Sequence, residues 1–160
     1  MELLEIFVFL GSILVCFLAA AIVGHFTEKS LGAWYLRLSK PAITPPEWVF
    51  TVIWSLLYLL MGLALGIVLT EGRPEQLAAP VLLFVIQLCL RIAWAAAFFG
   101  QRNPAAGFVI LMMQWLFTAL TSLSFAAVAF EAGMLLIPHL LWISFGLILN
   151  YRFLKLNRIW

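Results

Sequence analysis

The chain has 160 residues, of which 66% are hydrophobic and 10% are charged, and its mean hydropathy is +1.13. A soluble domain of this length needs far more charge to cover its surface, so the composition excludes a soluble globular protein. The formal net charge of +2 gives no basic surface for nucleic acid. Cys16 and Cys89 lie inside apolar runs without a Cys or His cluster, and they predict neither a disulfide nor a metal site.

Five apolar runs are each long enough to cross a bilayer, which takes about 20 residues. Charged residues, Gly or Pro mark the breaks between the runs, which cover roughly residues 5–26, 46–70, 80–99, 105–129 and 133–154. Runs this continuously apolar favour helices, because the strands of a membrane barrel alternate. We therefore predict an all-α, multi-pass integral membrane protein, in which residues 1–160 form a single domain of five transmembrane helices.

The longest connection between these runs covers residues 27–45 and is amphipathic rather than polar. Leu31, Trp34, Tyr35 and Leu38 follow a near-helical spacing within it. Such a segment lies at the mouth of a bundle or in the headgroup region, where Trp and Tyr are favoured. Long ordered loops in small domains are often lids, so we expect this first loop to cover one end of the bundle.

The two ends of the expected bundle differ in basic charge. Five spans place the first loop and the C-terminus at one end, and the opposite end carries only Arg73. The end with the first loop collects Lys29, Arg37, Lys40, Arg102, Arg152, Lys155 and Arg158. The positive-inside rule therefore predicts that the first loop and the C-terminus face the cytoplasm of a bacterial-type cell.

Arg91 lies in the middle of the third expected span, where a central arginine costs roughly 2.5–3.5 kcal/mol on insertion scales. Gln87, Trp94 and Phe98 share its helical face. Two interpretations stay open: Arg91 belongs to an internal polar site, or it extends toward the cytoplasmic end and stacks on Trp94. In the internal position an unpaired cation is costly, which predicts an anionic partner.

Aromatic residues also form a stripe on the second expected span. Trp54 and Tyr58 are an i, i+4 pair, and Phe50 extends their stripe toward the cytoplasmic mouth. Trp48 is expected in the interfacial aromatic belt. Trp54 lies about two turns inside the span, where its indole N–H needs an acceptor, and this favours a cavity beside it.

The fifth expected span has a comparable stripe of His139, Trp142, Gly146 and Asn150. A lone histidine in such a stripe is more often a hydrogen-bonded structural residue than a ligand or a base. The sequence has no paired intramembrane carboxylates, nucleophile elbow or phosphate-binding loop. These absences disfavour conventional enzyme turnover.

Together these motifs resemble the tryptophan-rich sensory protein family, also called the translocator protein or peripheral-type benzodiazepine receptor family (TspO/MBR). The resemblance extends over essentially the whole chain. It rests on Trp34-Tyr35, Lys40-Pro41, PPEWVF at 45–50, Trp54, Leu57-Tyr58, Gln87-Leu88, Trp94, Phe98-Phe99-Gly100, Asn103-Pro104, Pro138, Leu140, Trp142, Leu149-Asn150 and Leu156-Asn157.

The resemblance implies a five-helix bundle, often dimeric, whose cavity opens under the first loop and binds porphyrins, sterols or benzodiazepine-type ligands. By position, it implies a ligand-binding pocket of Phe50, Trp54, Trp142, Gly146 and Leu149, covered by the loop with Trp34. The stripes described above add Tyr58, Gln87, Arg91, Trp94 and His139. The expected partners are a tetrapyrrole or sterol-like molecule, membrane lipid and a second copy of the chain, with no nucleic acid, no metal and no required cofactor.

Three functional hypotheses follow. The first is binding of a flat hydrophobic ligand, a porphyrin or a sterol, by a sensor, carrier or scavenger. The second, implied by the resemblance, is light- or oxygen-dependent porphyrin degradation, in which Trp54 is the only catalytic candidate. The third is a structural or assembly role in the membrane. The lack of an acid and base pair favours binding over degradation.

Three sites in this chain depart from the family's usual pattern. Arg91 replaces a usual Asn, and Pro138-His139 replaces a usual Pro-Tyr. Ala42 and Ile43 stand where aromatic residues often precede the double proline. The change at Arg91 introduces a fixed cation in place of a neutral amide, which puts an inherited ligand preference in question.

Overall fold

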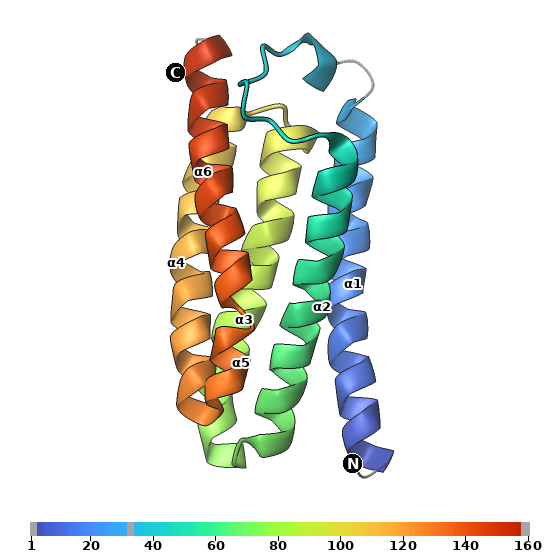
Figure 1. The fold of residues 1–160 in the computed structure, drawn as a ribbon, viewed down its shortest axis with the longest axis vertical. Coiled ribbons are helices and arrows are strands. Elements are labelled where there is room, and N and C mark those ends of the chain that lie inside the picture. The colour runs from blue at the N-terminus through green and yellow to red at the C-terminus, as the bar shows by residue number, and fades with distance from the viewer. Residues whose placement is uncertain (1–2, 32–33, 158–160) are drawn as a thin grey trace.

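The computed structural model describes residues 3–31 and 34–157, which form an upright bundle of long helices (Figure 1). The helices are α1 (Leu3–Leu31), α2 (Glu47–Glu71), α3 (Pro74–Ala95), α4 (Pro104–Val128), α5 (Phe130–Met134) and α6 (Ile137–Asn157). Five helical segments are long and apolar enough to cross a membrane, and the described residues include no strand. The predicted all-α membrane fold is therefore confirmed.

The third transmembrane helix begins at Pro74, whereas the apolar run predicted a start at residue 80. Pro74 occupies its first turn, where the missing N–H would have no partner in any case. The side-chain oxygen of Gln76 accepts a hydrogen bond from the backbone N–H of Arg73 at 3.4 Å. A polar first turn thus extends the helix beyond the apolar segment.

This helix ends in a π-helical turn, η2 (Ala96–Gly100). A π turn holds more residues than an α turn, so it changes the direction in which the following side chains point. As a result both Phe98 and Phe99 are buried, although neighbouring residues on a regular helix point about 100° apart. Arg102 follows with a positive φ of 54° in the tight connection to α4.

The fifth span, predicted as one helix at 133–154, is divided into α5 and α6. Pro138 has no N–H to offer the carbonyl of Met134, and its ring would collide with that carbonyl in a continuous helix. The chain turns at residues 135–136, where the backbone N–H of Leu136 bonds to the carbonyl of Gly133 at 3.1 Å. The Ser122 hydroxyl donates to the same carbonyl from α4 at 2.9 Å.

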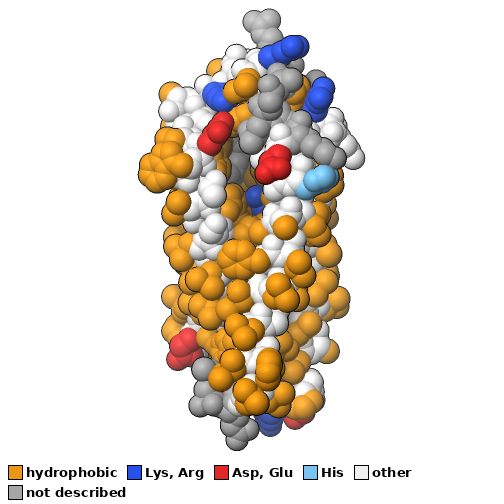
Figure 2. Space-filling view, turned by 90° about the vertical axis from the view of Figure 1, so that its right-hand side faces the viewer, with side chains coloured by type: hydrophobic (Ala, Val, Ile, Leu, Met, Phe, Trp, Pro, Cys, Tyr) orange, Lys and Arg blue, Asp and Glu red, His pale blue; other side chains and the backbone are white. Residues whose placement is uncertain are grey.

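Helices α1 and α2 touch closely near the N-terminal end of α1 and separate toward its other end. A Cβ on Gly62 would lie 2.6 Å from the Cα of Ile13, and one on Gly66 would lie 2.4 Å from the Phe9 ring. The GxxxG sequence of α2 therefore serves a contact within the chain. Further along α1, Gly24 has no neighbouring atom within 4 Å, and a hollow is visible on this side of the molecule (Figure 2).

The first loop lies across the end of the bundle that also carries the C-terminus, which is called the loop end below (Figure 1). A 3₁₀ turn, η1 (Tyr35–Arg37), places the Tyr35 ring 5.8 Å from Phe99 and 5.9 Å from Phe153 between ring centroids. Asn157 joins the loop to α6, because its amide accepts from the Ser39 N–H at 2.9 Å and donates to the Ser39 carbonyl at 3.1 Å.

Candidate functional site

A cavity of about 820 Å³ lies at the loop end of the bundle and opens between α1, α2 and the first loop (Figure 2). This volume is typical of small-molecule sites. Aromatic side chains from the helices and the loop make up much of its lining: Phe17, Tyr35, Phe50, Trp54, Tyr58, Trp94, Phe98, Phe99, Trp142, Phe145 and Phe153.

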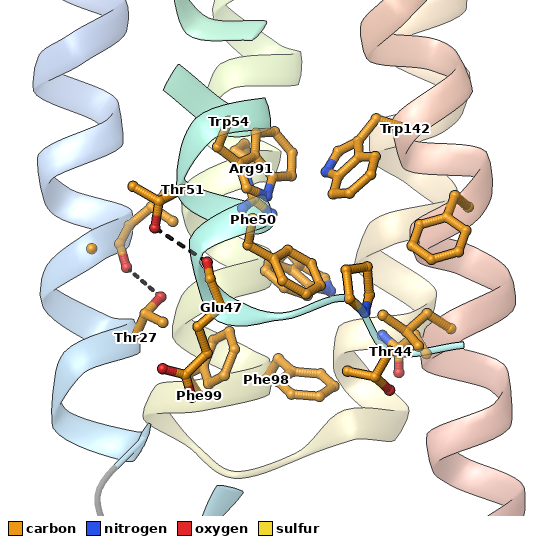
Figure 3. Close-up of a pocket in the computed structure, with 18 of the residues that line it drawn as sticks. Thr27, Thr44, Glu47, Phe50, Thr51, Trp54, Arg91, Phe98, Phe99 and Trp142 are labelled. Atoms are coloured by element: carbon orange, nitrogen blue, oxygen red, sulfur yellow. Dashed lines mark hydrogen bonds between the residues drawn. The ribbon is translucent and has the colours of Figure 1, made fainter. Parts of the chain in front are cut away.

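Helix α2 supplies one wall of the cavity through Phe50, Trp54 and Tyr58, which recur every four residues and so lie on one helical face. Trp142 of α6 faces this wall, and Figure 3 shows its ring directed toward Trp54. The centroid of the Trp142 ring lies 5.7 Å from that of Phe50 and 6.4 Å from that of Trp54, with edge-to-face angles of 72° and 83°. Edge-to-face contacts of this kind fix the orientation of the rings.

Arg91 of α3 lies at the end of the cavity away from the first loop, beside Trp54 (Figure 3). Its guanidinium carbon is 3.7 Å from the centre of the Trp54 ring and 4.4 Å from that of Trp94. The stacking on Trp94 agrees with the second interpretation of the sequence. However, only 4% of the residue is exposed, so the side chain stays inside the bundle and does not reach the membrane surface.

The π turn η2 forms the part of the cavity nearest the loop. Ring centroids of Phe98 and Phe99 are 4.8 Å apart, and those of Trp94 and Phe98 are 5.4 Å apart and nearly parallel. Tyr35 covers Phe99 from the loop side. Sequence reasoning included Trp94 and did not include Phe99, because a π turn leaves no recognisable sequence signal.

Polar groups are concentrated at the rim of the cavity. Glu28 and Glu47 are exposed there, together with Lys40, whose ammonium lies 4.6 Å from the centre of the Tyr35 ring. The hydroxyls of Thr27 and Thr51 donate to carbonyls of their own helices, as the dashed lines in Figure 3 show. These hydroxyl oxygens therefore remain able to accept a hydrogen bond from a ligand.

Eight of the predicted ligand-binding residues line the cavity. They are Phe50, Trp54, Tyr58, Arg91, Trp94, Trp142, Gly146 and Leu149.

The other three predicted residues support the cavity wall from behind. Trp34 packs edge-on against Phe98, with ring centroids 5.9 Å apart. Gln87 is fully buried one turn from Arg91, where its amide oxygen accepts from the Thr118 hydroxyl at 3.3 Å. His139 is 1% exposed and stacks edge-on against Trp54 at 5.7 Å between ring centroids.

Sequence reasoning missed the contribution of α1 to the cavity. Phe17, Ala20, Val23, Gly24 and Thr27 lie on the side of α1 that faces the cavity. The first span is apolar on all sides, so no periodic pattern separates its cavity face from its lipid face. Only the separation of α1 from α2 reveals which residues line the cavity.

The fold and the site together define a multi-pass helical membrane protein with an aromatic cavity under its first loop. The chain belongs to the TspO/MBR family, whose model matches residues 12–156. It is 43% identical to the tryptophan-rich protein TspO of Chlorobaculum tepidum, over 82% of this chain and 84% of that protein.

Two further relatives extend the similarity beyond one lineage. The chain is 36% identical to the tryptophan-rich sensory protein of Cereibacter sphaeroides, over 78% of this chain and 77% of that protein. It is also 36% identical to the translocator protein of Homo sapiens, over 79% of this chain and 76% of that protein. The resemblance found in the sequence is therefore confirmed.

Proposed function

We propose that this membrane protein binds a flat hydrophobic ligand in the aromatic cavity and acts as a sensor, carrier or scavenger of that ligand. The preferred ligand class is a tetrapyrrole, and a sterol is the second candidate. The observation that supports this proposal most directly is the cavity itself, whose volume and aromatic lining suit a large planar molecule.

The positions of the rings also support a planar ligand. Phe50 and Trp142 point into the space between α2 and α6, where they present faces and edges to anything that enters (Figure 3). The polar groups of the rim would remain near water. The relatives named as sensory and translocator proteins fit a membrane sensor or carrier.

Tryptophan fluorescence provides the test. Purified protein is titrated with protoporphyrin dimethyl ester and, separately, with cholesterol, for Trp54→Leu and for the matched control Trp48→Leu. Trp48 is 70% exposed on the same helix and does not line the cavity. Since one aromatic contact contributes about 0.5–1.5 kcal/mol, Trp54→Leu should weaken binding about two- to tenfold, and Trp48→Leu should leave it unchanged.

The outcomes separate the three functional hypotheses. Quenching by neither ligand would overturn the binding proposal and favour a structural or assembly role. Formation of a discrete new species from the bound porphyrin in light, lost in Trp54→Phe with binding retained, would favour the degradation hypothesis. Trp54 is suitably placed for either role because it lies in the cavity wall.

A further inference from the structure

The end of the cavity formed by Trp54, Arg91 and Trp142, called the deep end here, contains a buried positive charge. Arg91 lies on α3, while the indole rings that cover its guanidinium come from α2 and α3. Cation–π contacts with two rings offset part of the cost of burying this charge. They do not supply the in-plane acceptors that the N–H groups of a guanidinium require.

Within the described part of the chain, no carboxylate pairs with Arg91. The polar side chains beside it are those of Tyr58 and His139, and neither is a carboxylate. The acidic residues that line the cavity, Glu28 and Glu47, are exposed at its rim. A buried cation without a counterion is among the costlier arrangements in a protein, more so within a membrane.

Two buried donors at the deep end lack an acceptor. They are the Nε of Arg91 and the indole Nε1 of Trp94. Neither ring nitrogen of His139, behind Trp54, has a hydrogen-bond partner, and one of the two is a donor in the neutral ring. An incoming carboxylate would supply both the missing acceptor and the missing negative charge.

We propose that the deep end is an anion-binding subsite that takes a carboxylate carried by the flat hydrophobic ligand. The ligand's ring system would occupy the aromatic part of the cavity while its carboxylate pairs with the guanidinium of Arg91, which lines the cavity. This inference rests on the proposed function and narrows it to acidic ligands. A lipid phosphate is the less suitable source, because Arg91 contacts Trp54, which lies about two turns inside α2.

The test compares protoporphyrin free acid with its dimethyl ester in nanodiscs of phosphatidylcholine, which carries no net charge. The ring system is the same in both ligands, so the ratio of their dissociation constants reports the carboxylates. The dissociation constant of the ester divided by that of the acid should be about 10- to 100-fold larger for the wild-type protein than for Arg91→Gln. Arg91→Lys, which keeps the charge without the planar donor set, should retain part of this difference.

Arg37→Gln is the matched control. It removes an exposed cation of the first loop that does not line the cavity. Because water screens that charge, the ratio should change less than threefold. A loss in Arg37→Gln equal to that in Arg91→Gln would overturn the assignment of the carboxylate to the deep end.

The results also distinguish this inference from the proposed function. Binding of the ester by every variant shows that the cavity is intact, and an unchanged acid-to-ester ratio in Arg91→Gln would then overturn the anion subsite alone. Failure of the wild-type protein to bind either form would overturn the proposed function. If Arg91→Gln does not fold, Arg91→Lys decides, since a ratio identical to wild type would exclude a planar guanidinium–carboxylate contact.

Discussion

Gly62 of α2 meets the backbone of α1 so closely that a Cβ on this glycine would lie 2.6 Å from the Cα of Ile13. Two helices can approach to this distance only where one of them lacks a side chain. The contact joins α1 to α2 in the half of the bundle away from the loop. In the other half the two helices separate, and the cavity opens in the space between them.

Gly62→Val should therefore separate α1 from α2 and destabilise the protein. The clash involves the backbone of Ile13, which cannot move as a flexible side chain would. Overpacking of this kind costs about 1–3 kcal/mol. Thermal unfolding in detergent measures the effect, with Gly11→Val as the control because nothing lies within 4 Å of a Cβ at Gly11. Equal stability of the two variants would contradict this account of the helix contact.

Gly24→Leu should fill part of the cavity without disturbing the fold. Gly24 lines the cavity, and a Cβ there would meet no atom within 4 Å. Gly11→Leu makes the same change on the same helix outside the cavity. We expect Gly24→Leu to weaken binding of a porphyrin ester at least tenfold and Gly11→Leu to leave it unchanged. The fluorescence titration described above gives both values, and equal affinities would show that the ligand lies elsewhere.

The first loop should loosen when its attachment to α6 is removed. Asn157→Ala deletes both hydrogen bonds to the backbone of Ser39, whereas Asn157→Asp keeps an acceptor for the Ser39 N–H. Each bond contributes about 0.5–1.5 kcal/mol. Amide exchange in residues 34–46 should become several-fold faster in Asn157→Ala and less so in Asn157→Asp. Unchanged exchange would mean that the aromatic contacts of Tyr35 alone hold the loop, and would weaken the prediction that it acts as a lid.

The burial of Tyr35 in the first loop should also make the free energy of unfolding fall at alkaline pH. Burial raises the pKa of the Tyr35 hydroxyl above its ordinary value of about 10, and the negative charge of Glu47 raises it further. The folded state thus holds the proton more tightly than the unfolded state. The resulting stability is complete below about pH 10 and is lost as the pH rises from there through the raised pKa.

Thermal unfolding between pH 9 and pH 11.5 checks this prediction. Tyr35→Phe should show a shallower alkaline decline than the wild-type protein, because its ring cannot ionise. Glu47→Gln should give an intermediate slope, since it removes the smaller of the two causes. Identical slopes in all three proteins would exclude Tyr35 as the titrating group.

The orientation in the membrane remains a prediction from the basic residues. The test uses a protein in which Cys16 and Cys89 are replaced and one new cysteine stands at position 73 or at position 102. These two positions lie in connections at opposite ends of the bundle, so their labelling reports the orientation. An impermeant thiol reagent added to intact cells should label position 73 and leave position 102 unlabelled. Labelling of 102 alone would reverse the orientation. Cross-linking in nanodiscs would test the predicted homodimer in the same preparations.

The sequence by itself determined that the protein is an all-α, multi-pass membrane protein with five spans. Continuously apolar runs of about 20 residues form helices in a bilayer, because a helix satisfies its own backbone groups and the strands of a barrel would alternate. For Arg91 the sequence left two interpretations open, an internal site and an extension to the cytoplasmic end, and only the structure showed that the side chain stays buried. Helix ends were less well determined, and the break at Pro138 depended on a local clash that apolar periodicity does not show.

Only the tertiary structure decided which of these residues meet. The cavity exists because Gly62 holds α1 close to α2 at one end, while the two helices diverge at the other. The π turn places Phe99 beside Phe98, and the path of the loop brings Tyr35 over them. Trp34, Gln87 and His139 lie behind the cavity wall instead of in it. Helix separation and rotation result from packing between distant segments, which a pattern within one segment does not record.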